Sequence, residues 1–301
     1  MQMNYHNPVL LHESVDALSV KEDGVYVDVT FGGGGHSREI LKRLGETGRL
    51  FGFDQDPDAQ ENVFDDDRFV LIPENFRYIS RFLRFHGVRK VDGVLADLGV
   101  SSHQFNEAER GFSTRFDGDL DMRMNQKSKI SAKEIINNYS EEKLAEILFS
   151  YGELRNSRNI AKTIVEKRQE EKIDTSFQLR KVLQKYLPNA KEHKIIAQIF
   201  QAIRIEVNEE LDVLKEFLQQ LPNLLKEDGR LSVISYHSLE DRLVKRFFRT
   251  GLFNGEPEKD IFGNSEVPLE KIGKLIVPTP QEIKLNNRAR SAKLRIATLK
   301  K

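Results

Sequence analysis

The most restrictive feature of this sequence is a front part in which short, β-rich apolar runs alternate with segments of helical spacing. The apolar runs, each four to six residues long, are 25–30, 50–53, 69–72 and 93–97. Compact runs of this kind are typical of strands buried on both faces of a parallel sheet. Residues 37–44 and 78–85 between them repeat with helical spacing, which gives a βαβα order. We therefore expect an α/β protein with a doubly wound, Rossmann-like sheet.

A second region is expected to be helical and inserted into this sheet. Thirteen of the 19 glycines lie between Gly24 and Gly118, and none lies between Gly152 and Gly229. Ser131 with Glu134 forms a capping box, and one long helix is predicted from apolar steps of three and four through 196–221. Residues 230–235 then resemble a sheet strand again. The predicted domains are a discontinuous core, 1–107 with 206–301, and an all-helical insert, 108–205.

Composition excludes several classes of protein. The chain has no cysteine, which excludes disulfides, cysteine-ligated zinc or iron–sulfur sites, and a thiolate nucleophile. Hydrophobic residues make up 39% of the chain, enough for a folded interior. The apolar runs are too short to span a bilayer, and the first residues lack the pattern of a secretory signal. We expect a cytoplasmic protein without a membrane partner.

The charges are balanced overall but unevenly distributed. The chain carries 47 basic and 47 acidic residues, yet 126–205 has 16 Lys or Arg against 10 Asp or Glu, and 283–301 has seven basic residues and no acid. A basic insert and a basic tail predict an asymmetric nucleic-acid footprint. A solvated, charged helix surface is the alternative for the insert, although it explains the acid-free tail less well.

A glycine loop follows the first predicted strand and leads into a helix. Asp54, at the end of the second strand, comes 22 residues after Gly32, the position at which a carboxylate accepts hydrogen bonds from ribose hydroxyls. The alternative for the loop alone is a tight turn. A dinucleotide fingerprint needs a third glycine where this chain has Ser37, and no P-loop sequence occurs.

Acidic residues surround this loop. They are Asp28, Asp54, Asp56 and Asp97. Carboxylates repel a pyrophosphate but suit a cationic sulfonium with a free amino group. The residues therefore favour S-adenosylmethionine as the cofactor and a methyltransferase as the protein.

Longer motifs carry a resemblance to a known family. They are TFGGGGHS (30–37), DGVLADLGVSSHQ (92–104), ERGFS (109–113), DLDMRM (119–124), FQAIRIEVNEEL (200–211), SYHSLEDRLVKRF (235–247) and NRARSAKLR (287–295). In order and over nearly the whole chain, they resemble the RsmH family, also called MraW. The resemblance implies the class I methyltransferase fold and methylation of the exocyclic N4 of one decoding-centre cytidine in 16S ribosomal RNA. The implied partner is this RNA or the small ribosomal subunit.

The resemblance also implies which residues contact the cofactor. They are Gly34, Gly35, His36, Asp54, Phe76, Asp97 and Gln104. The residues by themselves already indicate Gly34, Gly35, Asp54 and Asp97. By that reasoning Phe76 could equally belong to the core, and Gln104 could be a surface polar residue.

Two residues are catalytic candidates, Asp97 and His237. Asp97 keeps the position of a hydrogen-bond acceptor for an amino group, but the following Leu-Gly-Val-Ser-Ser lacks the prolines and the aromatic residue of many amino-methyltransferases. Phe112 and Tyr236 are therefore candidates for stacking on the cytosine, with the core as the alternative for each. His237 could orient the base or relay a proton. Its alternative is a cap on the next helix, with Ser238 as N-cap and Asp241 completing the box.

Four residues are candidates for RNA contacts. Arg204 and Asn208 lie one helical turn apart, and Arg288 and Arg290 lie in the basic tail. The alternative for Arg204 is a salt bridge to an acid such as Glu206 or Asp212. Phosphate contacts of this kind position a nucleic acid without reading its sequence.

Several alternatives stay open. A nicotinamide-dependent oxidoreductase is disfavoured by the missing glycine and the acidic loop. A non-catalytic RNA-binding assembly factor with a vestigial cofactor fold is the alternative from another class, and a methyltransferase acting on DNA or a small molecule is the third. We expect no metal, because one histidine among scattered acids is a weak ligand set, and a homodimer is possible through the apolar insert.

Overall fold

The computed structural model describes residues 8–263 and 265–300. The chain divides into two compact units, Met1–Gly99 with Leu211–Lys301, called here the sheet unit, and Val100–Glu210, called the helical unit. The helical unit is longer at both ends than the insert expected from the sequence (108–205). The reason is packing, since Val100, Phe105 and Val207 lie against the core of the helical unit.

The sheet unit contains seven strands and six α-helices in its described part. The strands are β1 (Val25–Asp28), β2 (Arg49–Phe53), β3 (Phe69–Ile72), β4 (Val91–Asp97), β5 (Leu225–Ser235), β6 (Leu269–Ile276) and β7 (Lys293–Leu299). The helices are α1 (Leu11–Asp16), α2 (Gly35–Arg43), α3 (Ile79–Phe85), α10 (Glu210–Leu224), α11 (Ser238–Thr250) and α12 (Pro280–Leu285).

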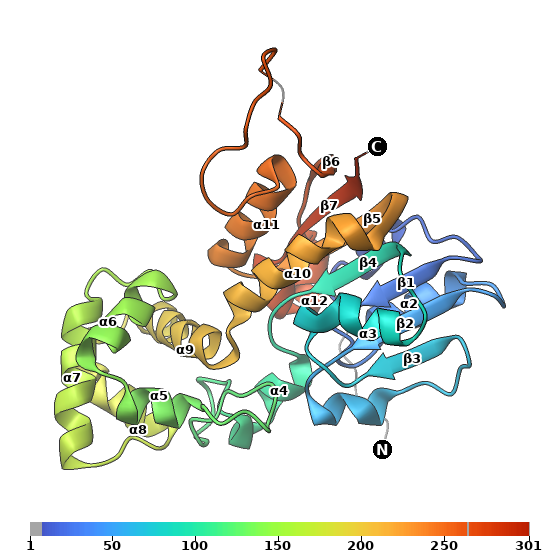
Figure 1. The fold of residues 1–301 in the computed structure, drawn as a ribbon. Coiled ribbons are helices and arrows are strands. Elements are labelled where there is room, and N and C mark those ends of the chain that lie inside the picture. Colours follow the sequence, from blue (N-terminus) through green and yellow to red (C-terminus); the bar gives the residue numbers. More distant parts are fainter. Residues whose placement is uncertain (1–7, 264, 301) are drawn as a thin grey trace. The chain divides into compact units, whose positions relative to one another are not determined.

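The strands form one sheet in the order β3-β2-β1-β4-β5-β7-β6 (Figure 1). β1 to β5 are parallel, and β7 runs antiparallel between β5 and β6. This topology confirms the predicted Rossmann-like α/β class. The carboxyl ends of β1, β2, β4 and β5 meet along one side of the sheet, called here the carboxyl edge, where ligands bind in folds of this kind.

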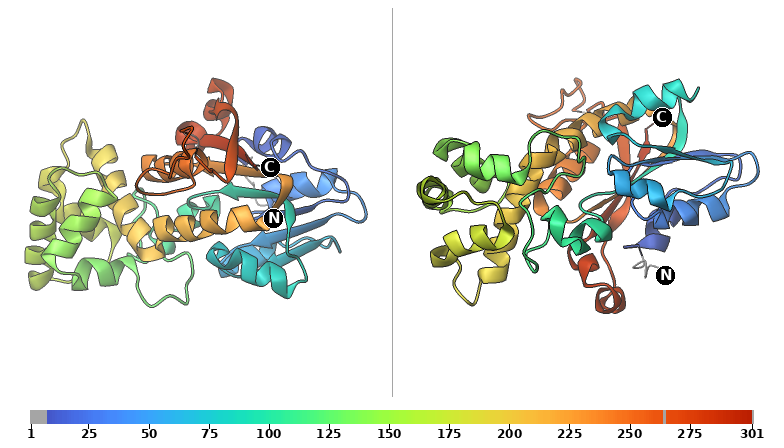
Figure 2. Two further views of the ribbon diagram at one scale, coloured as in Figure 1. Left: turned by 45° about the horizontal axis from the view of Figure 1, so that its top comes forward. Right: turned by 90° about the horizontal axis from the view of Figure 1, so that it is seen from below.

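Both faces of the sheet are covered by helices, which explains the continuous apolar runs (Figure 2). Val27, Phe51 and Val94 point into one core, shared with side chains of α3, α10 and α11. Their neighbours Tyr26 and Leu50 point into the other, shared with α1 and α2. The strands are therefore held rigidly, and their ends can position side chains at the carboxyl edge.

The helical unit is built from six α-helices among its described residues. They are α4 (Ser102–Asn106), α5 (Ala132–Asn138), α6 (Glu141–Ser150), α7 (Ser157–Glu170), α8 (Ser176–Val182) and α9 (Glu192–Asn208). The predicted capping box of Ser131 and Glu134 opens α5. The unit has its own apolar core, to which α5, α6, α7, α8 and α9 contribute.

The single long helix expected through 196–221 is wrong. α9 ends at Asn208, and Glu209 takes the left-handed conformation (φ 50°) before α10 begins at Glu210. The Asn208 side chain holds the backbone of a neighbouring segment at this point. Its amide donates to the Met122 carbonyl and its oxygen accepts the Met124 N–H. The interruption separates the helix of one unit from the helix of the other.

In the part of the chain that the structure describes, no helix is both long and apolar enough to cross a bilayer.

Candidate active site

The glycine loop connects β1 to α2 at the carboxyl edge. Gly34 has φ 72°, a conformation that favours glycine, and a Cβ built there would lie 2.6 Å from the Phe64 ring. A Cβ on Gly35 would lie 2.2 Å from Pro8. These glycines can pack this closely because they have no side chains. Their backbone is therefore the surface that the loop offers to a ligand.

Asp54 holds this loop from the end of β2. Its carboxylate accepts hydrogen bonds from the backbone N–H of Gly32 at 2.8 Å and of Asp56 at 2.9 Å. Burial raises the pKa of Asp54 to about 6, against the opposing effect of these two bonds. Asp54, the predicted partner of the cofactor's ribose, therefore lies directly beside the predicted glycine loop.

Asp97 ends β4 and lies next to the same loop. Its backbone N–H donates to Thr30 Oγ1 at 2.7 Å, and its Oδ1 accepts a hydrogen bond from the Tyr236 hydroxyl at 2.7 Å. Its side chain keeps 22% of its surface exposed. Burial raises the pKa of Asp97 to about 6, and the nearby His36 partly opposes this rise. An acidic group with a pKa near neutrality, accessible at a sheet edge, is suited to accepting a proton.

His36, in the first turn of α2, approaches Asp97 from the loop side. Its Nε2 lies 3.1 Å from the carbonyl oxygen of Val9, which can only accept, so this nitrogen carries a proton. Its Nδ1 lies 3.8 Å from Asp97 Oδ2. The ring is thereby fixed with its second nitrogen toward the carboxylate.

A third carboxylate completes the cluster. Asp28 is fully buried at the end of β1, where it accepts hydrogen bonds from Ser37 Oγ and the Thr30 N–H, and burial raises its pKa. Within the described residues, no lysine or arginine pairs with Asp28, Asp54 or Asp97. The cluster is therefore rich in negative charge, as a cationic ligand requires.

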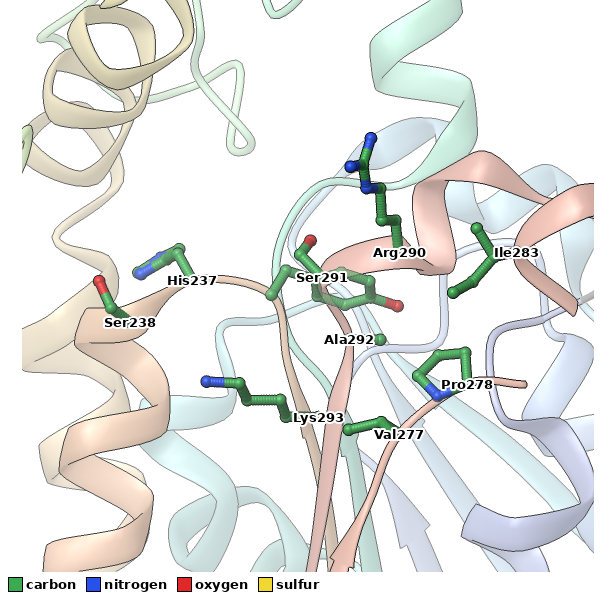
Figure 3. Close-up of a pocket in the computed structure, with 10 residues that line it drawn as sticks. His237, Ser238, Val277, Pro278, Ile283, Arg290, Ser291, Ala292 and Lys293 are labelled. Atoms are coloured by element: carbon green, nitrogen blue, oxygen red, sulfur yellow. The ribbon is translucent and has the colours of Figure 1, made fainter. Parts of the chain in front are cut away.

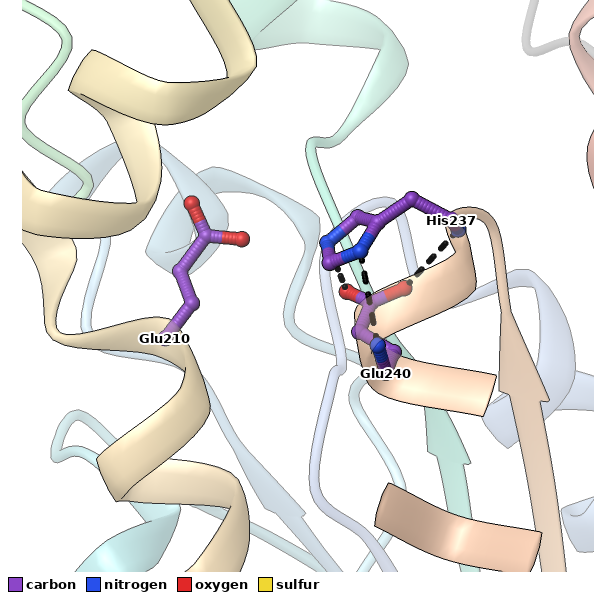
Figure 4. A group of neighbouring side chains, drawn as sticks. All are labelled: Glu210, His237 and Glu240. Carbon is purple, nitrogen blue, oxygen red and sulfur yellow. Dashed lines mark hydrogen bonds and ion pairs between the residues drawn. The ribbon is translucent and has the colours of Figure 1, made fainter. Parts of the chain in front are cut away.

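His237 begins α11 as its N-cap. The backbone N–H of Glu240 donates to His237 Nδ1 at 3.4 Å, and Nε2 of the ring lies 3.1 Å from Glu240 Oε1 (Figure 4). The alternative reading of His237 as a cap on the next helix therefore agrees with the structure, but the N-cap is His237 and not Ser238, and Glu240 and not Asp241 completes the box. Glu240 also accepts the backbone N–H of Tyr236 at 2.9 Å, so it orders the turn that presents the tyrosine.

Two further aromatic candidates are packed against other side chains. Phe76, in the 3-10 turn Phe76–Tyr78 after β3, is partly buried and meets Phe217 edge-on at 5.2 Å between ring centroids. Phe112 is 5% exposed and belongs to the core of the helical unit. This burial favours the core alternative for Phe112. Gln104 is buried in the helical unit, where it forms a capping box with Ser101.

The RNA candidates fall into two groups. In the helical unit, Arg204 donates to both oxygens of Glu210 at 2.7 and 2.8 Å, so it forms a salt bridge to a neighbouring acid, as in the alternative predicted for it, with Glu210 as the partner. Asn208 fixes the Met122–Met124 backbone, as described above. In the sheet unit, Arg288 and Arg290 lie in the 3-10 turn Asn287–Ser291, and Arg290 is exposed.

Sequence reasoning missed two residues of this site. Thr30 ties the glycine loop to β4 through Asp97, and Glu240 orders the turn of Tyr236. Thr30 had a detectable signal, since it is a hydrogen-bonding residue directly after a strand. Glu240 lay in the sequence as an ordinary first-turn acid of a helix, and only its contacts show its role.

Comparison with known proteins identifies the family. The sequence model of the MraW methylase family matches residues 3–300. A protein of Flavobacterium johnsoniae named ribosomal RNA small subunit methyltransferase H is 64% identical, with 98% of each chain covered. Proteins of the same name from Christiangramia forsetii (98% of each chain) and Bacteroides fragilis (99% of each chain) are 65% and 54% identical. A solved rRNA methylase from Streptococcus thermophilus aligns over 99% of each chain with a TM-score of 0.44 and 11% identity. The chain belongs to the MraW methylase family.

Proposed function

We propose that this protein methylates small-subunit ribosomal RNA, with S-adenosylmethionine as methyl donor and the exocyclic N4 of one decoding-centre cytidine as acceptor. Membership of a methylase family and relatives named for the small-subunit RNA support the reaction class. The observation that carries the finer proposal is Asp97, a partly exposed carboxylate at the carboxyl edge, hydrogen-bonded through one oxygen to Tyr236.

The residues at the carboxyl edge fit the proposed cofactor. Three carboxylates that have no lysine or arginine partner among the described residues favour a ligand that brings positive charge. S-adenosylmethionine supplies a methyl group activated by a sulfonium cation. The glycine loop with Gly34, Gly35 and His36, the carboxylates of Asp54 and Asp97, and the ring of Phe76 are the groups of the sheet unit that would hold it. The proposed contact of Gln104 stays a prediction.

Asp97 is proposed to act on the amino group of the cytosine. The lone pair of this amine is delocalised into the ring, so the amine is a poor nucleophile. A carboxylate that accepts a hydrogen bond from an amino proton localises the lone pair and orients it. Bound S-adenosylmethionine would supply the methyl group and take back the electron pair of its carbon–sulfur bond. Asp97 would accept the amino proton that the nitrogen loses and pass it to solvent. The gain in rate is mainly positioning, and no cysteine is needed.

Tyr236 positions Asp97 for this step. Its hydroxyl donates to Oδ1, and its own pKa is raised well above the ordinary value by burial and by the neighbouring carboxylate. The tyrosine therefore stays protonated and remains a donor. Its place beside Asp97 keeps it as the candidate for contact with the cytosine ring. The backbone N–H of Glu240 donates to His237 Nδ1, so the proposed part of His237 is to hold the turn that carries Tyr236.

The RNA is proposed to meet the basic tail and the helical unit. Arg288 and Arg290 lie on the chain just before β7, and their charges would contact phosphate. The target base must leave its stack to reach the site. A ribosomal substrate agrees with the cytoplasmic location expected from the sequence, and a homodimer stays a prediction.

Methyl transfer to small subunits tests the proposal. Subunits from a strain lacking this activity are incubated with the protein and methyl-labelled S-adenosylmethionine, and the labelled nucleoside is identified by mass spectrometry. We expect N4-methylcytidine, lost in Asp97→Ala. Label in another nucleoside would overturn the proposed acceptor, and no label on subunits or naked RNA would favour a binding factor without activity.

A further inference from the structure

A pocket of about 430 Å³ lies beside Tyr236, in a part of the sheet unit that the proposed cofactor site does not use. Its walls come from the turn between β5 and α11, the segment after β6, α12, and the residues that lead into β7. Figure 3 shows Val277, Pro278 and Ile283 gathered on one side and His237 and Ser238 on the opposite side. Its volume falls within the range of pockets that hold small ligands.

One wall of the pocket is apolar. It is formed by Val277, Pro278, Ile283 and Ala292, and Val277 is 55% exposed. An apolar surface beside an aromatic residue suits the flat face of a base, because bases stack or pack on such surfaces irrespective of sequence.

The same pocket carries positive charge. Arg290 is exposed and, among the described residues, makes no hydrogen bond or ion pair. Lys293 lies 3.2 Å from Asp241, but that carboxylate also receives Arg295 at 2.7 Å. Two cations thus share one acid, and the residues that line the pocket include two cations, Arg290 and Lys293, and no acid. Apolar walls with cations at their side match a base joined to its phosphate.

The pocket is connected to the catalytic candidate through one side chain. Tyr236 lines the pocket, and its hydroxyl donates to Asp97 Oδ1. A ligand in the pocket would therefore lie one aromatic ring away from the carboxylate. In a strand of RNA, the nucleotide next to the target base lies at such a short separation.

We propose that this pocket binds one nucleotide of single-stranded RNA adjacent to the target cytidine. Its base lies against Val277, Pro278 and Ile283, and its phosphate contacts Arg290 and Lys293. The inference rests on the proposed function and extends it, because it assigns recognition of the strand next to the target to residues 277–293 of the sheet unit.

A charge reversal with a matched control tests the phosphate contact. Arg290→Glu is compared with Arg89→Glu, an exposed arginine just before β4, at the end of that strand away from the carboxyl edge. For Arg290→Glu we expect the KM for small-subunit RNA to rise about tenfold. The slope of log affinity against log salt concentration should become smaller in magnitude by about one. The kcat and the affinity for the cofactor should not change. Arg89→Glu should leave all four unchanged.

An acid placed in the apolar wall tests the base contact. Val277→Asp should raise the KM for RNA several-fold, whereas Phe85→Asp, an exposed apolar residue at the end of α3, should not. Photo-crosslinking of RNA substituted with 4-thiouridine beside the target should label the peptide containing residues 277–293. Equal effects of the site and control variants, or crosslinks confined to other peptides, would overturn the pocket assignment.

The two proposals fail in distinguishable ways. If the wild-type protein transfers no methyl group to subunits, the proposed function fails, and binding of single-stranded oligonucleotides to the same four variants still decides whether the pocket holds RNA. If transfer is normal while Arg290→Glu and Arg89→Glu behave alike, the pocket assignment fails alone.

Discussion

The carboxyl edge of the sheet unit and the helical unit treat their charges in opposite ways. At the carboxyl edge of the sheet unit, Asp28, Asp54 and Asp97 lie together without a lysine or arginine partner in the described chain, and burial raises the pKa of each. In the helical unit, Arg204 pairs with Glu210 and Arg123 with Asp121. The comparison teaches that charges satisfied within the fold stabilise it, whereas charges left unbalanced indicate where a ligand belongs.

Removing the charge of Asp97 should have the largest effect. Asp97→Asn keeps the shape and an oxygen that accepts the Tyr236 hydroxyl, but it removes the proton acceptor. We expect kcat to fall about 100- to 10,000-fold in a methyl-transfer assay. The ligand-free variant should melt at a higher temperature than the wild type, because a buried carboxylate is replaced by a neutral group. A variant that is fully active would contradict the assigned role, and Tyr236→Phe should show a smaller loss of the same kind.

A methyl group on the glycine loop should weaken cofactor binding. Gly34→Ala combines a left-handed conformation with a Cβ 2.6 Å from the Phe64 ring, so the loop must shift. We expect a loss of affinity for S-adenosylmethionine of about tenfold or more by calorimetry, together with about 1–2 kcal/mol of stability. Gly87→Ala is the matched control, since Gly87 has φ 76° and no atom near a built Cβ. It should cost stability without changing affinity.

The pH dependence of the reaction should follow the raised pKa of Asp97. The carboxylate must be ionised to accept the amino proton, so kcat/KM for the cofactor should fall as pH drops below about 6, approaching tenfold per pH unit. Between about pH 4 and pH 6, the Asp97 carboxyl is protonated in the folded protein but ionised in the unfolded chain, where its pKa is near 3.8. The charge of Asp97 therefore destabilises the fold as pH rises from about 4 to 6. The stability gained by Asp97→Asn should accordingly grow over this window, and a constant gain would contradict the shifted pKa.

The smallest effect on the reaction is expected in the helical unit. Arg204 and Glu210 keep 15% and 9% of their side chains exposed, so Arg204→Ala leaves a nearly buried carboxylate unpaired. We expect a loss of about 2–3 kcal/mol in the free energy of unfolding with cofactor affinity unchanged. Arg180→Ala, whose side chain is 37% exposed in its pair with Glu192, should cost about 1 kcal/mol or less. Weaker RNA binding by Arg204→Ala without lost stability would instead support the RNA contact expected from the sequence.

The predictable parts of this molecule are those encoded by nearby residues. The strand over 69–72, the capping box of Ser131 and the glycine loop beside Asp54 follow from local period and spacing, and the structure contains all three. The break at Glu209 was not predictable, because the apolar period continues across it without a glycine or proline. A cap at the start of α11 was predicted as the alternative role of His237, but its N-cap was placed on Ser238 because serine is the more usual N-cap residue.

Contacts between distant segments explain the rest. The bond from Tyr236 to Asp97 joins residues 139 positions apart, and it depends on β5 lying beside β4 in the sheet. The pocket beside Tyr236 likewise exists because the residues before β7 return to the end of β5. No local pattern encodes such pairs, so the sequence indicated these residues singly but not that they meet.

The position of β7 in the sheet also sets an order of assembly during synthesis. β6 leaves the ribosome before β7, yet it can join the sheet only through β7, which lies between it and β5. Strands β1 to β5 can pair as they emerge, since each has its sheet neighbour earlier in the chain or close behind it. Arg290 and Lys293 reach their places only when β7 joins the sheet, because they lie just before β7 and at its first residue. A nascent chain can therefore fold the glycine loop well before it can form the pocket beside Tyr236. The proposed RNA-binding pocket forms last.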